Sequence, residues 1–282
     1  MAVAQRIARL QSGDVSLFYR VFGSPGRTPL MILHGSNYYD SYDWIGVASK
    51  LATDREVMTP DRRGWGESTW SPSKDYTRDA LTDDIRAVAA AMKWTEKPII
   101  AGHSGAGPTV IAFAVNYPNE LSNLILVDSQ MNRDEDAVTG PTVGNPPLVF
   151  ESIEAGMARF AKLNNPPQVA TDRERMVHAL IKIETGYMLK RDPDNGNKKP
   201  IGVAEKPPKF PLREMWAELG MVKTPTLLVR GLRSDRFPPA TVDRFTKEYP
   251  HIPQATVDSQ HNIPGQAPDA FVEHVKKYIE AT

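Results

Sequence analysis

A short apolar strand that runs straight into a turn of small residues constrains this chain most. Pro98–Ala101 is followed at once by Gly102-His103-Ser104-Gly105-Ala106, and a helical pattern comes next. A sharp turn from strand to helix strains its central residue and needs small neighbours, which Gly102 and Ala106 supply. Ser104 would then project its hydroxyl from the carboxyl edge of a sheet. The Gly105 N–H, at the start of the helix, would point to where an oxyanion forms.

A serine nucleophile needs a base, and the base needs an acid that fixes its tautomer. Candidates for both come later in the chain, each in a loop after an apolar strand. Asp235 follows the strand expected at 226–231, and His261 follows the one expected at 255–257. We expect Asp235 to be the acid and His261 the base. Asp128, which also follows an apolar strand, is the competing candidate for the acid.

Three further motifs carry a resemblance to a known family. His34-Gly35-Ser36 follows the apolar stretch 29–33, residues 61–68 read D-R-R-G-W-G-E-S, and Tyr117-Pro118 precedes the apolar stretch 124–127. Together with the serine turn, these motifs resemble the α/β-hydrolase family along nearly the whole chain. The resemblance implies that the backbone N–H groups of Ser36 and Gly105 form the oxyanion hole. It also places the acid after the penultimate strand and the histidine after the last, where Asp235 and His261 stand.

The expected architecture is an α/β-hydrolase fold, with a mostly parallel twisted sheet, helices on both faces and a helical cap insertion. Residues 6–21 alternate between apolar and polar around Ser12-Gly13-Asp14, which predicts a hairpin. Residues 76–92 have the periodicity of an amphipathic helix. Because parallel strands bring their carboxyl ends to one edge, the loops that carry the candidate residues are expected to converge there.

The sequence predicts a core of residues 1–130 and 220–282 and a cap of residues 131–219. That intervening segment is too long for one crossover, and it contains helical patterns at about 149–163 and 171–189 before a polar, proline-rich stretch. Apolar side chains in it could line a substrate pocket or could instead pack the cap. The candidates for the pocket are Met131, Phe150, Met157 and Phe160, joined by Tyr38, Tyr39 and Trp44 after the oxyanion segment, which could equally anchor that loop.

Composition excludes several classes of protein. Lys plus Arg and Asp plus Glu balance at 34 each, so bulk charge attracts the chain neither to nucleic acid nor to an anionic membrane. The absence of cysteine removes thiol catalysis and thiolate metal sites. No metal or organic cofactor is required. We expect a small-molecule substrate as the partner, a monomer or homodimer, and a cytoplasmic location, because no signal peptide or membrane-spanning apolar run is evident.

These residues predict a serine hydrolase that cleaves a carboxylic ester or lactone of a small, largely apolar molecule through an acyl-enzyme on Ser104. One alternative is hydrolysis of a carbon–carbon bond in a β-diketone-like compound by the same three residues. Another is a non-catalytic small-molecule receptor, since fold alone does not dictate function. Epoxide and haloalkane hydrolysis are disfavoured, because family members with those activities have an aspartate at the position of Ser104.

Overall fold

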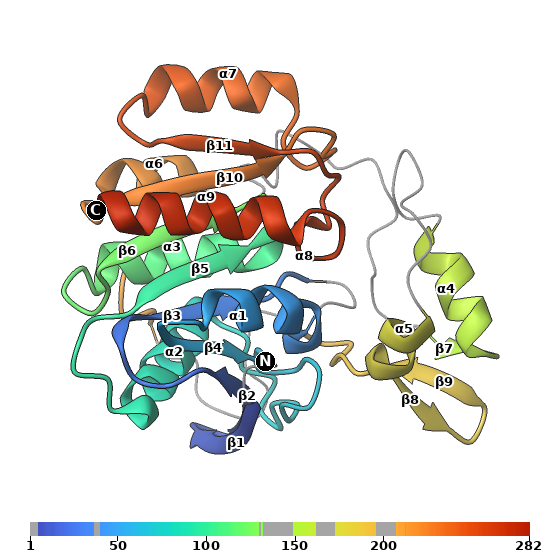
Figure 1. The fold of residues 1–282 in the computed structure, drawn as a ribbon. Coiled ribbons are helices and arrows are strands. Elements are labelled where there is room, and N and C mark those ends of the chain that lie inside the picture. Colours follow the sequence, from blue (N-terminus) through green and yellow to red (C-terminus); the bar gives the residue numbers. More distant parts are fainter. Residues whose placement is uncertain are drawn as a thin grey trace.

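A computed structural model describes residues 5–36, 40–129, 131, 149–161, 173–195, 207–211 and 213–282. The main sheet has the strand order β1-β2-β4-β3-β5-β6-β10-β11 (Figure 1). Its strands are β1 (Gln5–Ser12), β2 (Val15–Phe22), β3 (Arg27–Leu33), β4 (Arg55–Pro60), β5 (Ile99–His103), β6 (Asn123–Val127), β10 (Thr226–Gly231) and β11 (Gln254–Val257). The α/β-hydrolase architecture expected from the sequence is confirmed.

The first two strands form the predicted hairpin, and the strands after them run parallel. β1 pairs antiparallel with β2, and Gly13 at the turn has a φ of +55°, a left-handed conformation that glycine adopts without a steric penalty. β2 pairs antiparallel with β4, whereas the pairs from β4 through β3, β5, β6 and β10 to β11 are all parallel. The carboxyl ends of these parallel strands therefore meet at one edge of the sheet.

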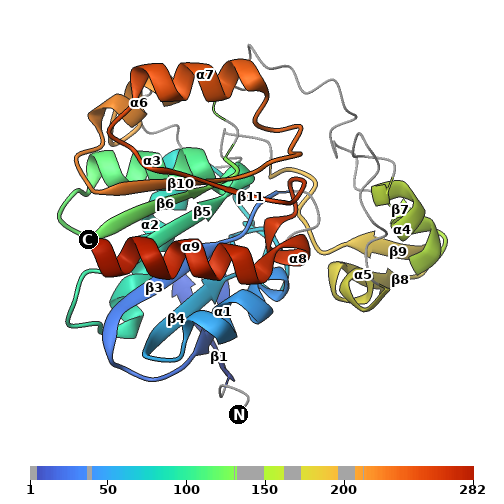
Figure 2. The same cartoon turned by 45° about the horizontal axis from the view of Figure 1, so that its top comes forward.

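The central strands are apolar throughout because both faces of the sheet are covered. Successive residues of β6 alternate between two separate clusters, with Leu124 and Leu126 on one face and Ile125 and Val127 on the other. The first face packs α2 (Arg78–Met92), α3 (Gly107–Asn116), α6 (Met215–Met221) and α7 (Pro239–Glu248). The second face packs α1 (Ile45–Leu51), α8 (Ile263–Gln266) and α9 (Pro268–Ala281), and Figure 2 shows α9 lying along it.

The described part of the cap is a mixed unit and not the purely helical one that the sequence predicts. It contains β7 (Val149–Phe150), α4 (Ile153–Ala161), α5 (Arg173–Ala179), β8 (Leu180–Ile183) and β9 (Gly186–Leu189), with the antiparallel sheet order β7-β9-β8. The helix expected to run to residue 189 is wrong beyond Ala179. From there the chain forms a hairpin, and Gly186 at its turn has a φ of +136°, which disfavours any other residue.

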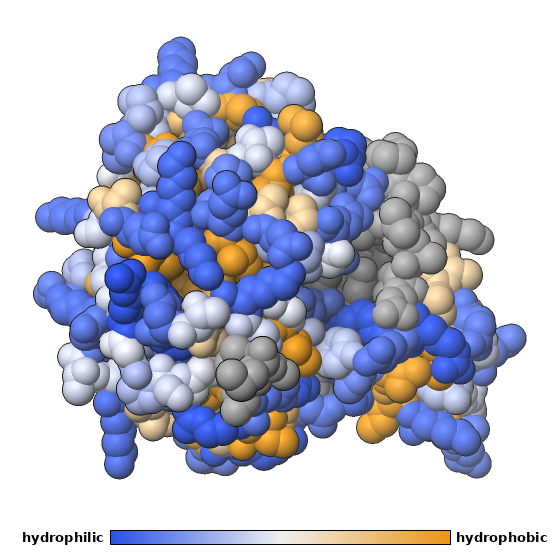
Figure 3. All heavy atoms as spheres, viewed as in Figure 1, coloured by the Kyte–Doolittle hydropathy of each residue, from blue (hydrophilic) through white to orange (hydrophobic). Residues whose placement is uncertain are grey.

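The cap has a small apolar core of its own. Aromatic and aliphatic side chains from its helices and strands bury one another, with Phe160 only 1% exposed. The outer side of this unit is partly apolar: Val149, Val177 and Ile181 are each more than 40% exposed, and apolar side chains gather on the cap in Figure 3. Because its apolar cluster is separate from the two clusters of the main sheet, the cap is a separately packed unit. It lies at the carboxyl edge of the sheet (Figures 1 and 2).

Helix α6 belongs with the core, although the predicted cap boundary at residue 219 cuts through it. Its Trp216 and Leu219 lie in the same buried cluster as the strands, and the Tyr249 hydroxyl donates a hydrogen bond to the Trp216 carbonyl (2.6 Å). None of the helices in the described ranges is both long enough and apolar enough to span a bilayer.

Candidate active site

The turn after β5 has the strained geometry that the sequence predicts for a nucleophile. Ser104 has a φ of +50°, which is unfavourable for a residue with a side chain, and it opens the short helix η2 (Ser104–Ala106) ahead of α3. Glycine is needed at position 102, because a Cβ there would lie 2.5 Å from a methyl group of Val110. Ala106 is fully buried. The backbone is thus forced to present the Ser104 side chain at the edge of the sheet.

A continuous chain of hydrogen bonds links Ser104, His261 and Asp128. The Ser104 hydroxyl lies 2.8 Å from Nε2 of His261, and Nδ1 of the same ring lies 2.6 Å from Oδ2 of Asp128. His261 is 5% exposed and Asp128 is fully buried. With Nδ1–H donating to the carboxylate, Nε2 is free of a proton and can accept one from the serine.

Asp128 is held rigidly at the end of β6. Its own φ is +44°, and its backbone N–H donates to the Val229 carbonyl (2.7 Å). Oδ1 accepts from the Gly231 N–H (3.0 Å), and Oδ2 accepts from the Ser234 hydroxyl as well as from the imidazole. These donors satisfy the oxygens of a fully buried carboxyl group and hold it in place beside His261.

The expectation that Asp235 contacts His261 is wrong. Both ring nitrogens of His261 face other groups, namely Ser104 and Asp128, and Asp235 instead forms an ion pair with Arg236 (3.3 Å) with 30% of its side chain exposed. β6 and β10 are neighbours in the sheet, so both loops reach the same edge and the order Ser, Asp, His permits either acid. The left-handed turn at Asp128 decides between them, and no residue type in the sequence signals that turn.

Ser36 and Gly105, the two residues that the resemblance assigns to the oxyanion hole, lie close together at the sheet edge. β3 and β5 are neighbours, and a Cβ on Gly105 would lie 3.6 Å from the Ser36 backbone nitrogen and only 2.0 Å from its hydroxyl oxygen. A side chain at position 105 would crowd that of Ser36, which lies directly opposite. Gly105 directly follows Ser104 within η2, so Ser36 lies close to the turn that carries the candidate nucleophile.

His34 connects the oxyanion segment to the turn after β4. Its Nδ1–H donates to the Gly35 carbonyl (2.7 Å), and its Nε2 accepts from the Arg62 N–H (2.9 Å). Burial, followed by the nearby Arg62 charge, holds the His34 pKa well below its usual range, so the ring stays neutral. His34 therefore braces the oxyanion segment by hydrogen bonds.

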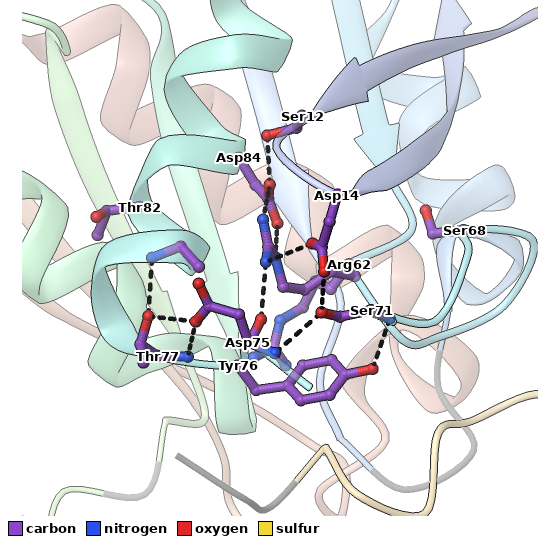
Figure 4. A network of polar contacts seen from close by, with 12 residues as sticks. Ser12, Asp14, Arg62, Ser68, Ser71, Asp75, Tyr76, Thr77, Thr82 and Asp84 are labelled. Atoms are coloured by element: carbon purple, nitrogen blue, oxygen red, sulfur yellow. Dashed lines mark hydrogen bonds and ion pairs between the residues drawn. The ribbon is translucent and has the colours of Figure 1, made fainter. Parts of the chain in front are cut away.

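The turn after β4 is itself fixed by a buried polar network (Figure 4). Arg63 forms a two-bond ion pair with Asp84 of α2 (2.6 and 2.7 Å), and Ser12 of the hairpin donates to the same carboxylate. The Tyr76 hydroxyl, which accepts from the Ser71 N–H at 3.1 Å, donates onward to buried Asp192 beyond the cap hairpin. The cap is therefore anchored to a rigid part of the core.

His103 lies directly behind the candidate base. Its ring stacks on His261 with the ring centroids 4.9 Å apart, and its Nε2–H donates to the His261 carbonyl (3.1 Å). Burial, with the proximity of His261, lowers the His103 pKa to about 3, so this ring stays neutral. No local pattern in the sequence indicates the hydrogen bond from His103 to the backbone of His261, because the two residues are 158 positions apart.

Five of the residues expected to line a substrate pocket are described, and each of them packs in an apolar cluster. Trp44 is fully buried with its ring edge-on to His103 and Phe271, so it anchors η1 (Ser41–Trp44) and does not face a pocket. Met131 lies in the core cluster with the strands and α3. Phe150, Met157 and Phe160 belong to the apolar core of the cap. Tyr38 and Tyr39 lie outside the described residues. We therefore do not assign a pocket wall to the five that are described.

Among the described residues, no three His, Cys, Asp or Glu side chains are grouped as metal ligands. Two cavities are found among the described residues, and Ser104 lines neither of them. One, of about 20 Å³, lies between α2 and the strands, and the other, of about 350 Å³, lies beside β1 and β2. The chemistry available at the sheet edge is that of the serine, the imidazole, the carboxylate and the backbone amides.

Comparison with known proteins agrees with this geometry. The family described as alpha/beta hydrolase fold matches residues 28–268. The chain is 24% identical over 257 residues to Lipase 1 of Psychrobacter immobilis, covering 90% of this chain and 76% of the relative. It is 25% identical over 270 residues to Lipase 3 of a Moraxella strain, covering 95% and 79%.

A solved structure is similar over a comparable length. The crystal structure of E-2-(acetamidomethylene)succinate hydrolase superposes with a TM-score of 0.80 at 19% identity, covering 98% of this chain and all of that one. At that identity the likeness shows the fold alone. The family match over most of the chain goes further, and the chain belongs to the α/β-hydrolase family.

Proposed function

We propose that this protein is a serine hydrolase that cleaves a carboxylic ester or lactone of a small, largely apolar molecule. The observation that carries the proposal is the unbroken series Ser104, His261, Asp128, with contacts of 2.8 and 2.6 Å, at a strained turn opposite the Ser36 amide. The similarity to two lipases favours an ester over other hydrolysable bonds.

In the first half of the proposed reaction, the Ser104 oxygen attacks the carbonyl carbon while Nε2 of His261 takes the hydroxyl proton. The oxyanion that forms accepts hydrogen bonds from the Ser36 and Gly105 amides. When the C–O bond to the leaving group breaks, the proton passes from Nε2 to the departing alkoxide. The alcohol leaves, and the acyl group remains on Ser104.

In the second half, a water molecule takes the place of the alcohol. Nε2 accepts a proton from that water as its oxygen attacks the acyl carbon, and Nε2 then returns the proton to Ser104 as the acid leaves. Asp128 stabilises the imidazolium in both halves and keeps the proton on Nδ1. We assign the acid role to Asp128 and none to Asp235.

We propose further that the cap limits which substrates reach Ser104. All the proposed catalytic groups lie outside residues 131–219, and the described cap stands at the carboxyl edge of the sheet. Since α6 packs with the core, we place the return to the core before Met215 and not at residue 220. A small-molecule substrate, no nucleic-acid or membrane partner and a monomeric or homodimeric state remain part of the proposal.

Labelling by a small fluorophosphonate, followed by a panel of aryl esters, lactones and β-diketones, tests the proposal. We expect stoichiometric modification of Ser104 and multiple turnover of at least one ester or lactone. Turnover of β-diketones alone would replace the ester hydrolase with a carbon–carbon hydrolase. Labelling without turnover of any compound would favour the small-molecule receptor, and a Ser104→Ala variant controls for modification at other sites.

A further inference from the structure

Helix α5 of the cap carries a buried arginine that binds the core. The Arg175 guanidinium donates from Nε to Oδ1 of Asp43 (2.6 Å) and from Nη2 to Oδ2 of the same carboxylate (2.8 Å). Both side chains are less than a tenth exposed. The planar, two-bond geometry fixes the orientation as well as the distance of the two elements. The cap is thereby tied to the short helix η1.

The carboxylate that Arg175 binds also closes the turn that follows the oxyanion segment. Oδ2 of Asp43 accepts from the Asp40 N–H (2.9 Å), and the Asp40 side chain accepts in return from the Asp43 N–H, which together form a capping box at the start of η1. Oδ1 of Asp40 also accepts from the Tyr42 N–H (2.8 Å). Asp40 is only four positions after Ser36 in the chain. Described contacts join η1 to the oxyanion segment through the turn after β4: the Ser41 N–H donates to Oδ1 of Asp61 (2.7 Å), and the N–H of the next residue, Arg62, donates to Nε2 of His34 (2.9 Å).

The other end of η1 supports the nucleophile. Trp44 packs edge-on to His103 with ring centroids 5.6 Å apart, and His103 both precedes Ser104 and donates to the His261 carbonyl. Buried aromatic packing of this kind leaves little free volume. A displacement of η1 would thus move the ring on which His261 rests.

Arg175 supplies a positive charge to a group of buried carboxyl groups around η1. Asp40 and Asp61 are both buried close together; burial raises the pKa of Asp40, and burial together with the Asp40 charge raises the pKa of Asp61 to about 7. Arg175 lies 3.5 Å from Asp40 and opposes this effect. Removal of Arg175 would take away the positive charge that the cap contributes beside Asp40 and Asp43.

We propose that Arg175 is a positioning residue of the hydrolytic site, which couples the seating of the cap to the geometry of the oxyanion segment and of the support behind Ser104. The inference rests on the proposed function. It predicts that loss of Arg175 slows hydrolysis even of a substrate too small to contact the cap. A residue that only held the cap in place would change the binding of larger substrates instead.

The test uses Arg175→Lys and Arg175→Gln, with Arg173→Gln as the matched control. Arg173 is on the same helix, but it is exposed and pairs with exposed Glu154 inside the cap. For a small aryl acetate, we expect kcat of both Arg175 variants to fall about 10- to 100-fold, the scale of a displacement near 1 Å at a reacting centre. The rate of fluorophosphonate labelling should fall by a similar factor, while KM stays within about threefold and Arg173→Gln behaves as the wild type.

A double variant separates positioning from stability. Arg175→Gln combined with Asp43→Asn removes both charges, so the thermal midpoint should recover relative to Arg175→Gln alone, whereas kcat should remain low. Recovery of kcat together with the midpoint would overturn the proposal, as would wild-type kcat in both single variants. If the wild-type protein itself is not labelled at Ser104, the proposed function fails. If the wild-type protein is labelled and the Arg175 variants have the same kcat and labelling rate as the wild type, this inference alone fails.

Discussion

Asp128 lies 2.6 Å from Nδ1 of His261, although 133 positions separate the two residues in the chain. The contact exists because β6, β10 and β11 are successive neighbours in the sheet, so the loops after β6 and β11 reach the same edge, and because Asp128 has a left-handed conformation at the end of β6. It identifies which of two acidic residues can stabilise the imidazolium.

The first prediction concerns that acid. Asp128→Asn should keep the fold and lower kcat by about 10³- to 10⁴-fold, because the amide favours the wrong imidazole tautomer. Asp235→Asn is the matched control and should cost less than tenfold, since Asp235 pairs with Arg236 away from the ring. Ester hydrolysis measured for both variants checks the prediction, and the opposite ranking would return the acid role to Asp235.

The second prediction concerns the serine and the histidine acting as a unit. Ser104→Ala and His261→Ala should each lower kcat by about three to six orders of magnitude, and the double variant should be little worse than either. Both side chains lie in loops at the sheet edge, so near-wild-type thermal midpoints are expected. Additive losses in steady-state kinetics would show that the two residues do not share one step.

The third prediction concerns acid stability. The His103 pKa is lowered to about 3 by burial, whereas in the unfolded chain a histidine titrates near 6.5. Between these values the unfolded state binds more protons, so the free energy of unfolding falls as the pH drops from about 6.5 toward 3. His103→Gln should reduce that slope by about 1.4 kcal/mol per pH unit, the value for one proton.

Denaturant unfolding at several pH values between 4 and 7 measures the slope. His34, whose pKa is also lowered by burial, should account for a further part of it, and His251→Gln, which replaces an exposed histidine, serves as the control. An unchanged slope in His103→Gln would mean that the ring is not kept neutral in the folded protein.

The fourth prediction concerns the core of the cap. Phe160→Ala should destabilise the cap by about 3–5 kcal/mol, the usual cost of removing a buried phenylalanine ring. Hydrogen exchange should then accelerate in α5, β8 and β9, while the amides of β5 and β6 keep their protection. Val177→Ala, at an exposed position of α5, provides the control.

A different result would restore the earlier interpretation of Phe160. Unchanged exchange in the cap, combined with a shift of one to three kcal/mol in relative kcat/KM among acyl sizes, is what a pocket-lining side chain would produce. In that case Phe160 would contact substrate as the sequence alone suggested.

The sequence by itself determined the parts of this protein that depend on local constraints. The small residues around Ser104, the glycine at the hairpin turn and the apolar strands that alternate between two faces each have a physical reason visible within a few residues, and the structure agrees with all three. Ser104 and His261 could be paired because parallel strands bring their loops to one edge.

Only the tertiary structure decided which acidic residue contacts His261 and what the apolar residues of the cap pack against. Asp128 and Asp235 both follow parallel strands, and a left-handed turn together with the hydrogen bonds from Gly231 and Ser234 places one of them beside His261. Periodicity likewise shows that Phe160 is buried but not against which partner. Contacts between residues far apart in the chain depend on the relative placement of whole elements, which no local pattern encodes.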